Sequence, residues 1–128
     1  MIAKRSLWRY VPAVLIAVAI PLLSLLPAVF FRKLSEGIPL FPGFDKAVHA
    51  SMYAALTTAA VFAFPWMQRL RAFLLLAAGA ALYGGLMELA QRWLTNSRSC
   101  DVWDGAANAT GAFIAALLYY FFRRVRTN

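Results

Sequence analysis

The chain has little cysteine, histidine or charge. Among its 128 residues, Cys100 is the only cysteine and His49 the only histidine. A lone cysteine excludes an intramolecular disulfide and a metal cluster built from several cysteines. Charged residues make up 14% of the chain, whereas about 25% is usual in a soluble domain. The shortage of charge therefore argues against an ordinary soluble domain.

The chain contains long apolar runs. Hydrophobic residues make up 62% of the chain, and the mean hydropathy is +0.66. Four apolar blocks of about 19–24 residues each are long enough to cross a hydrocarbon core of about 30 Å as helices. They lie at about residues 8–31, 44–64, 72–94 and 104–122. The blocks do not alternate as membrane strands do, so we expect an all-α membrane protein with four transmembrane helices in one compact bundle over residues 1–128.

The first block is interrupted by prolines. Pro12, Pro21 and Pro27 lie within it, and proline inside a helix removes a hydrogen bond and clashes with the preceding turn. No small-residue cleavage site follows the apolar run, so we interpret it as a retained helix and not as a signal peptide. We expect kinks in this helix, or an early end near Pro27.

The charges are distributed unequally between the two sides of such a bundle. Four crossings place both ends of the chain on the same side, with eight basic residues there and five on the other side. Because cytoplasmic flanks are richer in lysine and arginine, we expect both termini in the cytoplasm. All five acidic residues and His49 fall on the outer side. The net charge of +8 is explained by these flanks, so nucleic-acid binding is not expected.

Three segments bring polar side chains to the outer side. Their spacing of three or four residues places the members of each set on one helix face. Glu88 lies about six residues, or roughly 9 Å, inside the end of its helix. A charge at that depth costs about 2.5–3.5 kcal/mol unless it is paired. The candidate ligand-binding residues are Asp45, Lys46, His49, Tyr53, Glu88, Gln91, Arg98, Asp101, Asp104 and Asn108.

Two features bear on how these segments meet. Asp45 and Asp104 lie at expected helix starts, where a carboxylate also caps free N–H groups. Small residues, including Gly84, Gly85, Gly105 and Gly111, lie near the polar positions. Because small residues let membrane helices approach closely, we expect packing that draws the three polar faces into one cup.

The residue types leave several functions open for this cup. The first interpretation is a purely structural ion-pair cluster. The second is a head-group site in which Lys46, Arg98 and Arg92 contact phosphate. Acid–base chemistry is a third interpretation, with His49 and Glu88 as candidate catalytic residues. A site for Mg²⁺, Ca²⁺ or Mn²⁺ made of His49, Glu88 and the aspartates is a further alternative, but no HExxH-like spacing is present, so no metal ligand or other cofactor is assigned.

Two stretches carry a resemblance to a known family. DKAVHASMY (residues 45–53) resembles the D-K-x-x-H-x-x-x-Y motif of the VanZ-like membrane proteins. ELAQRWLTNSRSCDVWDGAANATG (residues 88–111) resembles their E-x-x-Q…R-x-x-D-x-x-D-x-x-x-N-x-x-G block. The likeness extends over about residues 44–122. It departs from the family in the loop before Arg98, which lacks the usual Pro-Gly turn and is one residue longer.

The resemblance implies a small multi-pass protein of the bacterial cell (inner) membrane. The family takes its name from a protein linked to resistance to teicoplanin, an antibiotic that acts on cell-wall precursors outside the membrane. It therefore implies binding of an anionic lipid head group or a lipid-linked envelope precursor at the outer face, with a link to glycopeptide resistance. Two alternatives remain: a membrane-embedded lipid phosphoester hydrolase, metal-assisted or not, and a non-catalytic accessory subunit with a protein partner. Whether the protein is an enzyme stays open.

Overall fold

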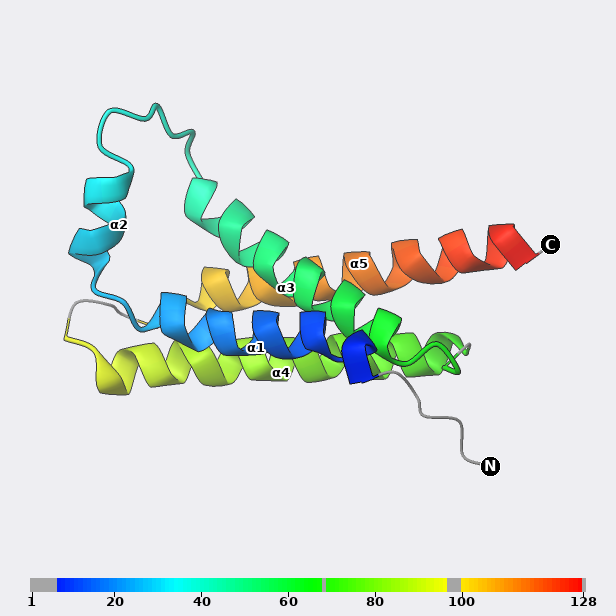
Figure 1. The fold of residues 1–128 in the computed structure, drawn as a ribbon. Coiled ribbons are helices and arrows are strands. Elements are labelled where there is room, and N and C mark those ends of the chain that lie inside the picture. Colours follow the sequence, from blue (N-terminus) through cyan, green and yellow to red (C-terminus); the bar gives the residue numbers. More distant parts are fainter. Residues whose placement is uncertain (1–6, 68, 97–99, 128) are drawn as a thin grey trace.

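The structure is a computed structural model that describes residues 7–67, 69–96 and 100–127. Within these residues all regular elements are helical, so the all-α prediction is confirmed. A short 3-10 helix, η1 (Leu7–Arg9), precedes the α-helices (Figure 1). The α-helices are α1 (Val11–Ser24), α2 (Ala28–Leu34), α3 (Phe44–Ala63), α4 (Leu70–Leu94) and α5 (Val102–Thr127).

The first apolar block forms two helices and not one. α1 ends at Ser24, and Pro27 precedes α2 in an extended conformation with φ −57° and ψ 139°. Proline disfavours a helical conformation in the residue before it, which explains the break at this point. The prediction of a single helix over residues 8–31 is therefore wrong, whereas the expected early end near Pro27 is confirmed. α2 then runs across the direction of α1 (Figure 1).

The closest helix contact is between α3 and α5. A Cβ atom added at Gly111 of α5 would overlap the carbonyl oxygen of Ala50 in α3, so only glycine fits at this crossing. α4 packs beside α5, and α1 lies against α3 and α4. The Tyr83 hydroxyl of α4 donates a 2.6 Å hydrogen bond to the carbonyl of Ala17 in α1, which fixes these two helices side by side.

Small and aromatic side chains fill the core between the helices. Tyr53 and Phe73 are each 1% exposed. Three alanines of the same core, from α4 and α5, are buried as well: Ala77, Ala112 and Ala116. Alanine and glycine at these positions let the helix backbones approach closely, as in other membrane bundles.

Three segments are long and apolar enough to cross a membrane: Leu7–Ser24, Leu70–Leu94 and Val102–Thr127. α3 was expected to be a fourth and is not among them, because its first two turns carry Asp45, Lys46 and His49. Large apolar side chains are exposed on the outside of the bundle, for example Leu75 at 71%. Three such segments in one chain indicate a multi-pass membrane protein.

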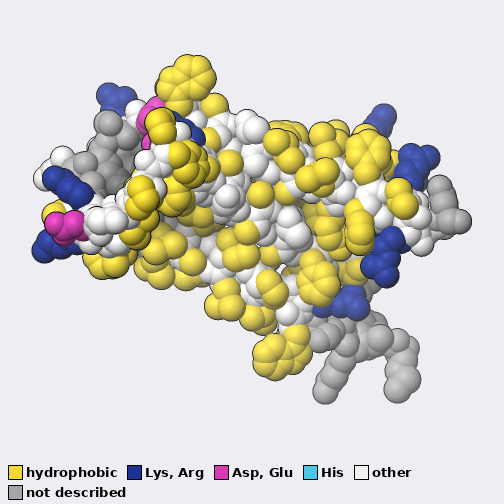
Figure 2. All heavy atoms as spheres, turned by 90° about the horizontal axis from the view of Figure 1, so that it is seen from above, with side chains coloured by type: hydrophobic (Ala, Val, Ile, Leu, Met, Phe, Trp, Pro, Cys, Tyr) yellow, Lys and Arg dark blue, Asp and Glu magenta, His cyan; other side chains and the backbone are white. Residues whose placement is uncertain are grey.

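The two ends of the bundle differ in charge. In Figure 2, hydrophobic side chains spread over the middle, lysine and arginine lie at both ends, and acidic side chains lie at one end only. Arg9, Phe62 and Arg123 line one cavity, so η1 and the ends of α3 and α5 meet at the basic end. The end with the acidic residues contains the polar residues predicted from the sequence.

Candidate functional site

The first turn of α3 places Lys46 at the centre of a charged cluster. Its ammonium nitrogen lies 2.8 Å from Oδ2 of Asp45, 2.7 Å from Oδ2 of Asp101 and 2.6 Å from Oδ1 of Asp104. Asp45 is a neighbour in sequence, whereas the other two carboxylates come from the start of α5. Lys46 therefore joins the outer ends of α3 and α5.

Asp101 caps α5 and also contacts Lys46. Its Oδ1 accepts a 2.8 Å hydrogen bond from the backbone N–H of Trp103, the usual contact of an N-cap aspartate. Hydrogen bonds from the Lys46 ammonium group and from this N–H stabilise the carboxylate, so the pKa of Asp101 lies below its ordinary value. Asp101 is thus fixed by its own helix as well as by the lysine.

Asp45 and Asp104 were expected from the sequence to cap their helices, but neither lies at a cap position. The N-cap position of α3 is Gly43, with φ 82° and no side-chain cap hydrogen bond, and Asp45 binds Lys46 instead. Asp104 lies inside the first turn of α5 and faces α3. Neither Asp45 nor Asp104 is therefore the N-cap residue of its helix: Asp45 pairs with Lys46 of its own helix, and Asp104 contacts Lys46 across the α3–α5 crossing.

His49 lies one turn further along α3, surrounded by three polar side chains. Its Nδ1 lies 3.1 Å from Oδ1 of Asn108 in α5 and 3.7 Å from Oε1 of Glu88 in α4. On the other side of the ring, Nε2 lies 3.7 Å from Oδ2 of Asp104. The imidazole therefore connects α3 with both neighbouring helices.

Glu88 is the most deeply buried acid of the cluster. It lies six residues before the end of α4 at Leu94, and its side chain is 5% exposed. Its Oε2 accepts a long hydrogen bond of 3.5 Å from the backbone N–H of Asp101. This contact ties α4 to the start of α5 and leaves Oε1 facing His49.

Tyr53 and Asn108 form the floor of the cluster. Both are buried, at 1% and 0% exposed. They pack over Gly84 of α4, where an added Cβ atom would lie 2.9 Å from Nδ2 of Asn108 and 3.1 Å from Cε1 of Tyr53. The Tyr53 hydroxyl and Asn108 Nδ2 have no hydrogen-bond partner among the residues that the structure describes.

The remaining predicted residues lie elsewhere or outside the described ranges. Gln91 is buried, and its Nε2 donates a 3.0 Å hydrogen bond to the carbonyl of Ser24. It therefore connects α4 with the end of α1 and does not turn towards His49. Arg92 is exposed on α4. Arg98 lies outside the described residues.

A cavity of about 640 Å³ adjoins the cluster on the side of α2. Most of its wall is apolar, from the end of α1, from α2 and the following loop, and from α3. Asp45 and His49 line it together with Arg32 of α2. Sequence reasoning did not assign Arg32 to the site, because nothing in its spacing relates it to α3. The one feature of the sequence that points to this region is the loop after Arg32, which is rich in proline and glycine and contains scattered apolar residues.

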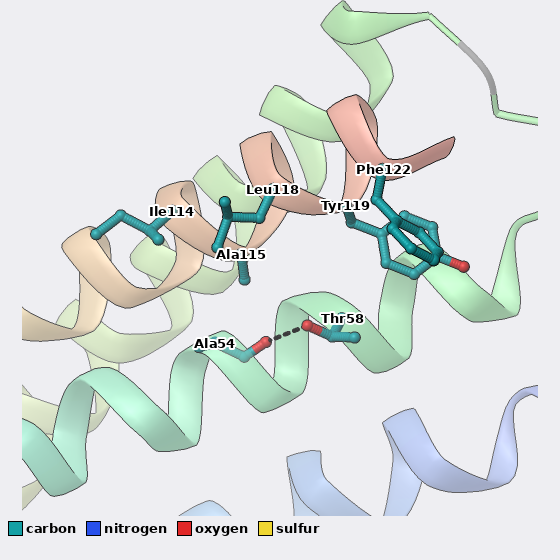
Figure 3. A pocket seen from close by; sticks show the side chains of 7 residues that line it. All are labelled: Ala54, Thr58, Ile114, Ala115, Leu118, Tyr119 and Phe122. Carbon is teal, nitrogen blue, oxygen red and sulfur yellow. Dashed lines mark hydrogen bonds between the residues drawn. The ribbon is translucent and has the colours of Figure 1, made fainter. Parts of the chain in front are cut away.

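A second cavity, of about 600 Å³, lies between α3 and α5 further towards the basic end (Figure 3). Ala54, Ile114 and Leu118 are among its lining residues. Thr58 contributes a hydroxyl, but this donates a 2.8 Å hydrogen bond to the carbonyl of Ala54 in its own helix. The cavity therefore presents an apolar wall, suited to contact with lipid tails.

Together, fold and cluster define a helical membrane protein with an ionisable, partly buried site at one end of its bundle. Comparison of the chain with protein-family models, with curated proteins and with solved structures found no match.

Proposed function

We propose that this is a multi-pass protein of a bacterial cell membrane that binds a lipid with an anionic head group at its outer face. In this proposal α3 is the fourth crossing and both termini are cytoplasmic. The charge distribution supports the orientation, since one end of the bundle is basic while the other has acidic side chains as well (Figure 2). The polar cluster then faces the outside of the cell.

The cavity between α2 and α3 is the observation that carries this proposal. Its apolar wall suits an acyl or polyprenyl chain. Arg32 lines the same cavity, and a guanidinium group is well suited to binding a phosphate. Lys46 is less suited to that role, because three carboxylates already surround its ammonium group. Arg32 is therefore the proposed phosphate contact.

The resemblance to the VanZ-like proteins supports a role in the cell envelope. The motif residues DKAVHASMY form the start of α3, which supplies one wall of the cavity. A lipid-linked envelope precursor has both features that the cavity suits, a long apolar chain and a phosphate. A link to glycopeptide resistance belongs to this proposal and follows from the resemblance alone.

Native mass spectrometry of the detergent-purified protein tests the binding of lipid. We expect retention of phosphatidylglycerol or a polyprenyl phosphate in preference to neutral phosphatidylcholine. Arg32→Gln should lower this retention about 10- to 150-fold, in line with the loss of one charged hydrogen bond of about 1.5–3 kcal/mol. Lys33→Gln is the matched control, because Lys33 is the next residue of α2 and does not line the cavity.

A cavity-filling substitution provides a second variant. Val48→Trp places a large side chain in the cavity wall and should reduce retention of every lipid, whatever its head group. Equal retention of charged and neutral lipids, unchanged in Arg32→Gln, would contradict the proposal. Activity of a periplasm-only reporter fused to the C-terminus would contradict the proposed orientation.

One observation favours hydrolysis of the bound lipid as a second candidate function. His49 lines the cavity and also lies 3.7 Å from the carboxylates of Glu88 and Asp104, an arrangement used in general acid–base catalysis. Purified protein incubated with a polyprenyl phosphate should then release inorganic phosphate, and His49→Gln should abolish the release. Absence of phosphate release from the wild-type protein would exclude this candidate for that substrate.

A further inference from the structure

We propose that His49, Glu88 and Asp104 form a binding site for one divalent transition-metal ion. Each residue offers one ligand atom, and the three atoms lie within 4.8 Å of one another. The residues come from three different helices, α3, α4 and α5. In a tetrahedral site with bonds of about 2.0–2.2 Å, neighbouring ligand atoms are about 3.3–3.6 Å apart. The three atoms must therefore come closer by up to about 1 Å when a metal ion binds.

The position of the imidazole supports this assignment. Nδ1 of His49 is in contact with Asn108 Oδ1, and Nε2 faces Asp104. Nε2 and Asp104 Oδ2 are 3.7 Å apart, which is too long for a hydrogen bond. A ring nitrogen and a carboxylate oxygen that face each other at this distance are suited to binding one metal ion between them. Asn108 would act as the outer partner that fixes the ring of a metal-binding histidine.

Two buried donors beneath the cluster are an independent observation. The Tyr53 hydroxyl and Asn108 Nδ2 lack hydrogen-bond partners among the described residues, and an unsatisfied buried donor costs about 1–3 kcal/mol. Both lie over Gly84, one helical turn from Glu88. Buried polar groups are normally hydrogen-bonded, so two donors without a partner beside the cluster favour a further occupant of the site.

The charge of the cluster favours a cation. Its described members include four carboxylates, those of Asp45, Glu88, Asp101 and Asp104, and a single ammonium group, that of Lys46, which pairs with three of them. A divalent ion would offset most of the excess negative charge. The one imidazole and two carboxylates suit Zn²⁺ or Mn²⁺ better than Ca²⁺, which prefers oxygen ligands alone.

A different explanation makes the opposite prediction for metal binding. If His49 were a cation that forms ion pairs with Glu88 and Asp104, the site would be complete without a metal and would bind none. Adding Zn²⁺ would then leave the melting temperature of the purified protein unchanged. The two explanations are therefore separated by binding measurements on the wild-type protein.

The experiment uses the full chain, delipidated and purified in detergent, titrated with Zn²⁺ and separately with Mn²⁺ and Ca²⁺. We expect one Zn²⁺ per chain by isothermal titration calorimetry and elemental analysis, with weaker binding of Ca²⁺. Glu88→Gln and His49→Ala should each weaken Zn²⁺ binding at least tenfold. Glu36→Gln is the control, since Glu36 is an acid at the same end of the bundle outside the cluster.

The result on the wild-type protein decides the proposal even where a variant fails to fold. Absence of a Zn²⁺ or Mn²⁺ site in the wild-type protein would overturn it, as would Zn²⁺ binding that survives Glu88→Gln in a folded variant. Because no lipid is present, this outcome is independent of the proposed lipid binding. A protein that binds metal and no lipid would leave this inference standing and refute the proposed function.

Discussion

The crossing of α3 and α5 depends on Gly111, and replacing this residue with alanine tests the packing that assembles the site. The added Cβ atom would overlap the carbonyl oxygen of Ala50. That oxygen belongs to the backbone of α3 and cannot rotate away as a side chain would. The two helices must therefore move apart at their closest point, within one turn of the contact between Asn108 and His49.

The size of the effect follows from two opposing contributions. Overpacking a well-packed core costs about 1–3 kcal/mol, and a rigid backbone obstacle puts this substitution near about 3 kcal/mol. Replacing a helical glycine with alanine stabilises the folded protein by about 1 kcal/mol, because alanine has the higher helix propensity. We therefore expect Gly111→Ala to lose about 2 kcal/mol. For a chain of this size that corresponds to roughly 6–10 °C in melting temperature, on the scale of soluble domains.

Thermal unfolding in detergent, followed by circular dichroism, measures this difference. Gly105→Ala is the matched control, because Gly105 lies in the same helix and an added Cβ atom there meets nothing within 4 Å. It should be neutral or up to about 1 kcal/mol stabilising. The reasoning is refuted if Gly111→Ala melts at or above the wild-type temperature, or if the two variants behave alike.

Three further substitutions test individual contacts by the same melting measurement. Gly84→Ala should destabilise the protein because the added methyl group presses on the floor of the cluster, while the exposed Gly85→Ala should not; equal melting of the two would contradict this. Gln91→Leu removes the buried hydrogen bond to α1 and should cost about 1–3 kcal/mol, and an unchanged melting temperature would show that α1 is held by other contacts. Lys46→Met should destabilise the protein most at neutral pH. Because the pKa of Asp101 is lowered from 3.8 by the lysine, this ion pair stabilises the protein above that pH and is lost as the pH falls through the lower, folded value. The difference from wild type should therefore shrink in acid, and a constant difference would contradict the role of the ion pair.

The helices themselves could largely be predicted from the sequence. Continuous apolar runs bounded by glycine, proline and charge predicted helices over residues 44–64 and 72–94, close to α3 and α4 as observed. The predicted end at residue 122 is too early, since α5 continues to Thr127. Arginine favours helices, and Arg123 is held by a 3.1 Å hydrogen bond to the carbonyl of Pro65. An apolar pattern cannot show such an extension, because it stops where the charged residues begin.

The partners of the polar side chains could be predicted only in part. Helical spacing placed Asp45, His49 and Tyr53 on one face of α3, and the depth of Glu88 indicated that it needs a partner. The same reasoning placed Gln91 beside Glu88, yet Gln91 turns to the end of α1. Spacing defines the faces of a helix but does not say which neighbouring helix covers each face. For the same reason the sequence did not connect Arg32 with the cavity beside α3.

By itself, the sequence determined the helical class, the apolar surface and the segregation of acidic residues to one end. These depend on local composition and on the spacing of residues within single helices. Only the tertiary structure decided that α3 crosses α5 at Gly111, that Lys46 joins three carboxylates, and that His49 lies between Glu88 and Asp104. These contacts depend on how closely the helix backbones approach and at which residues they cross, which no single helix encodes.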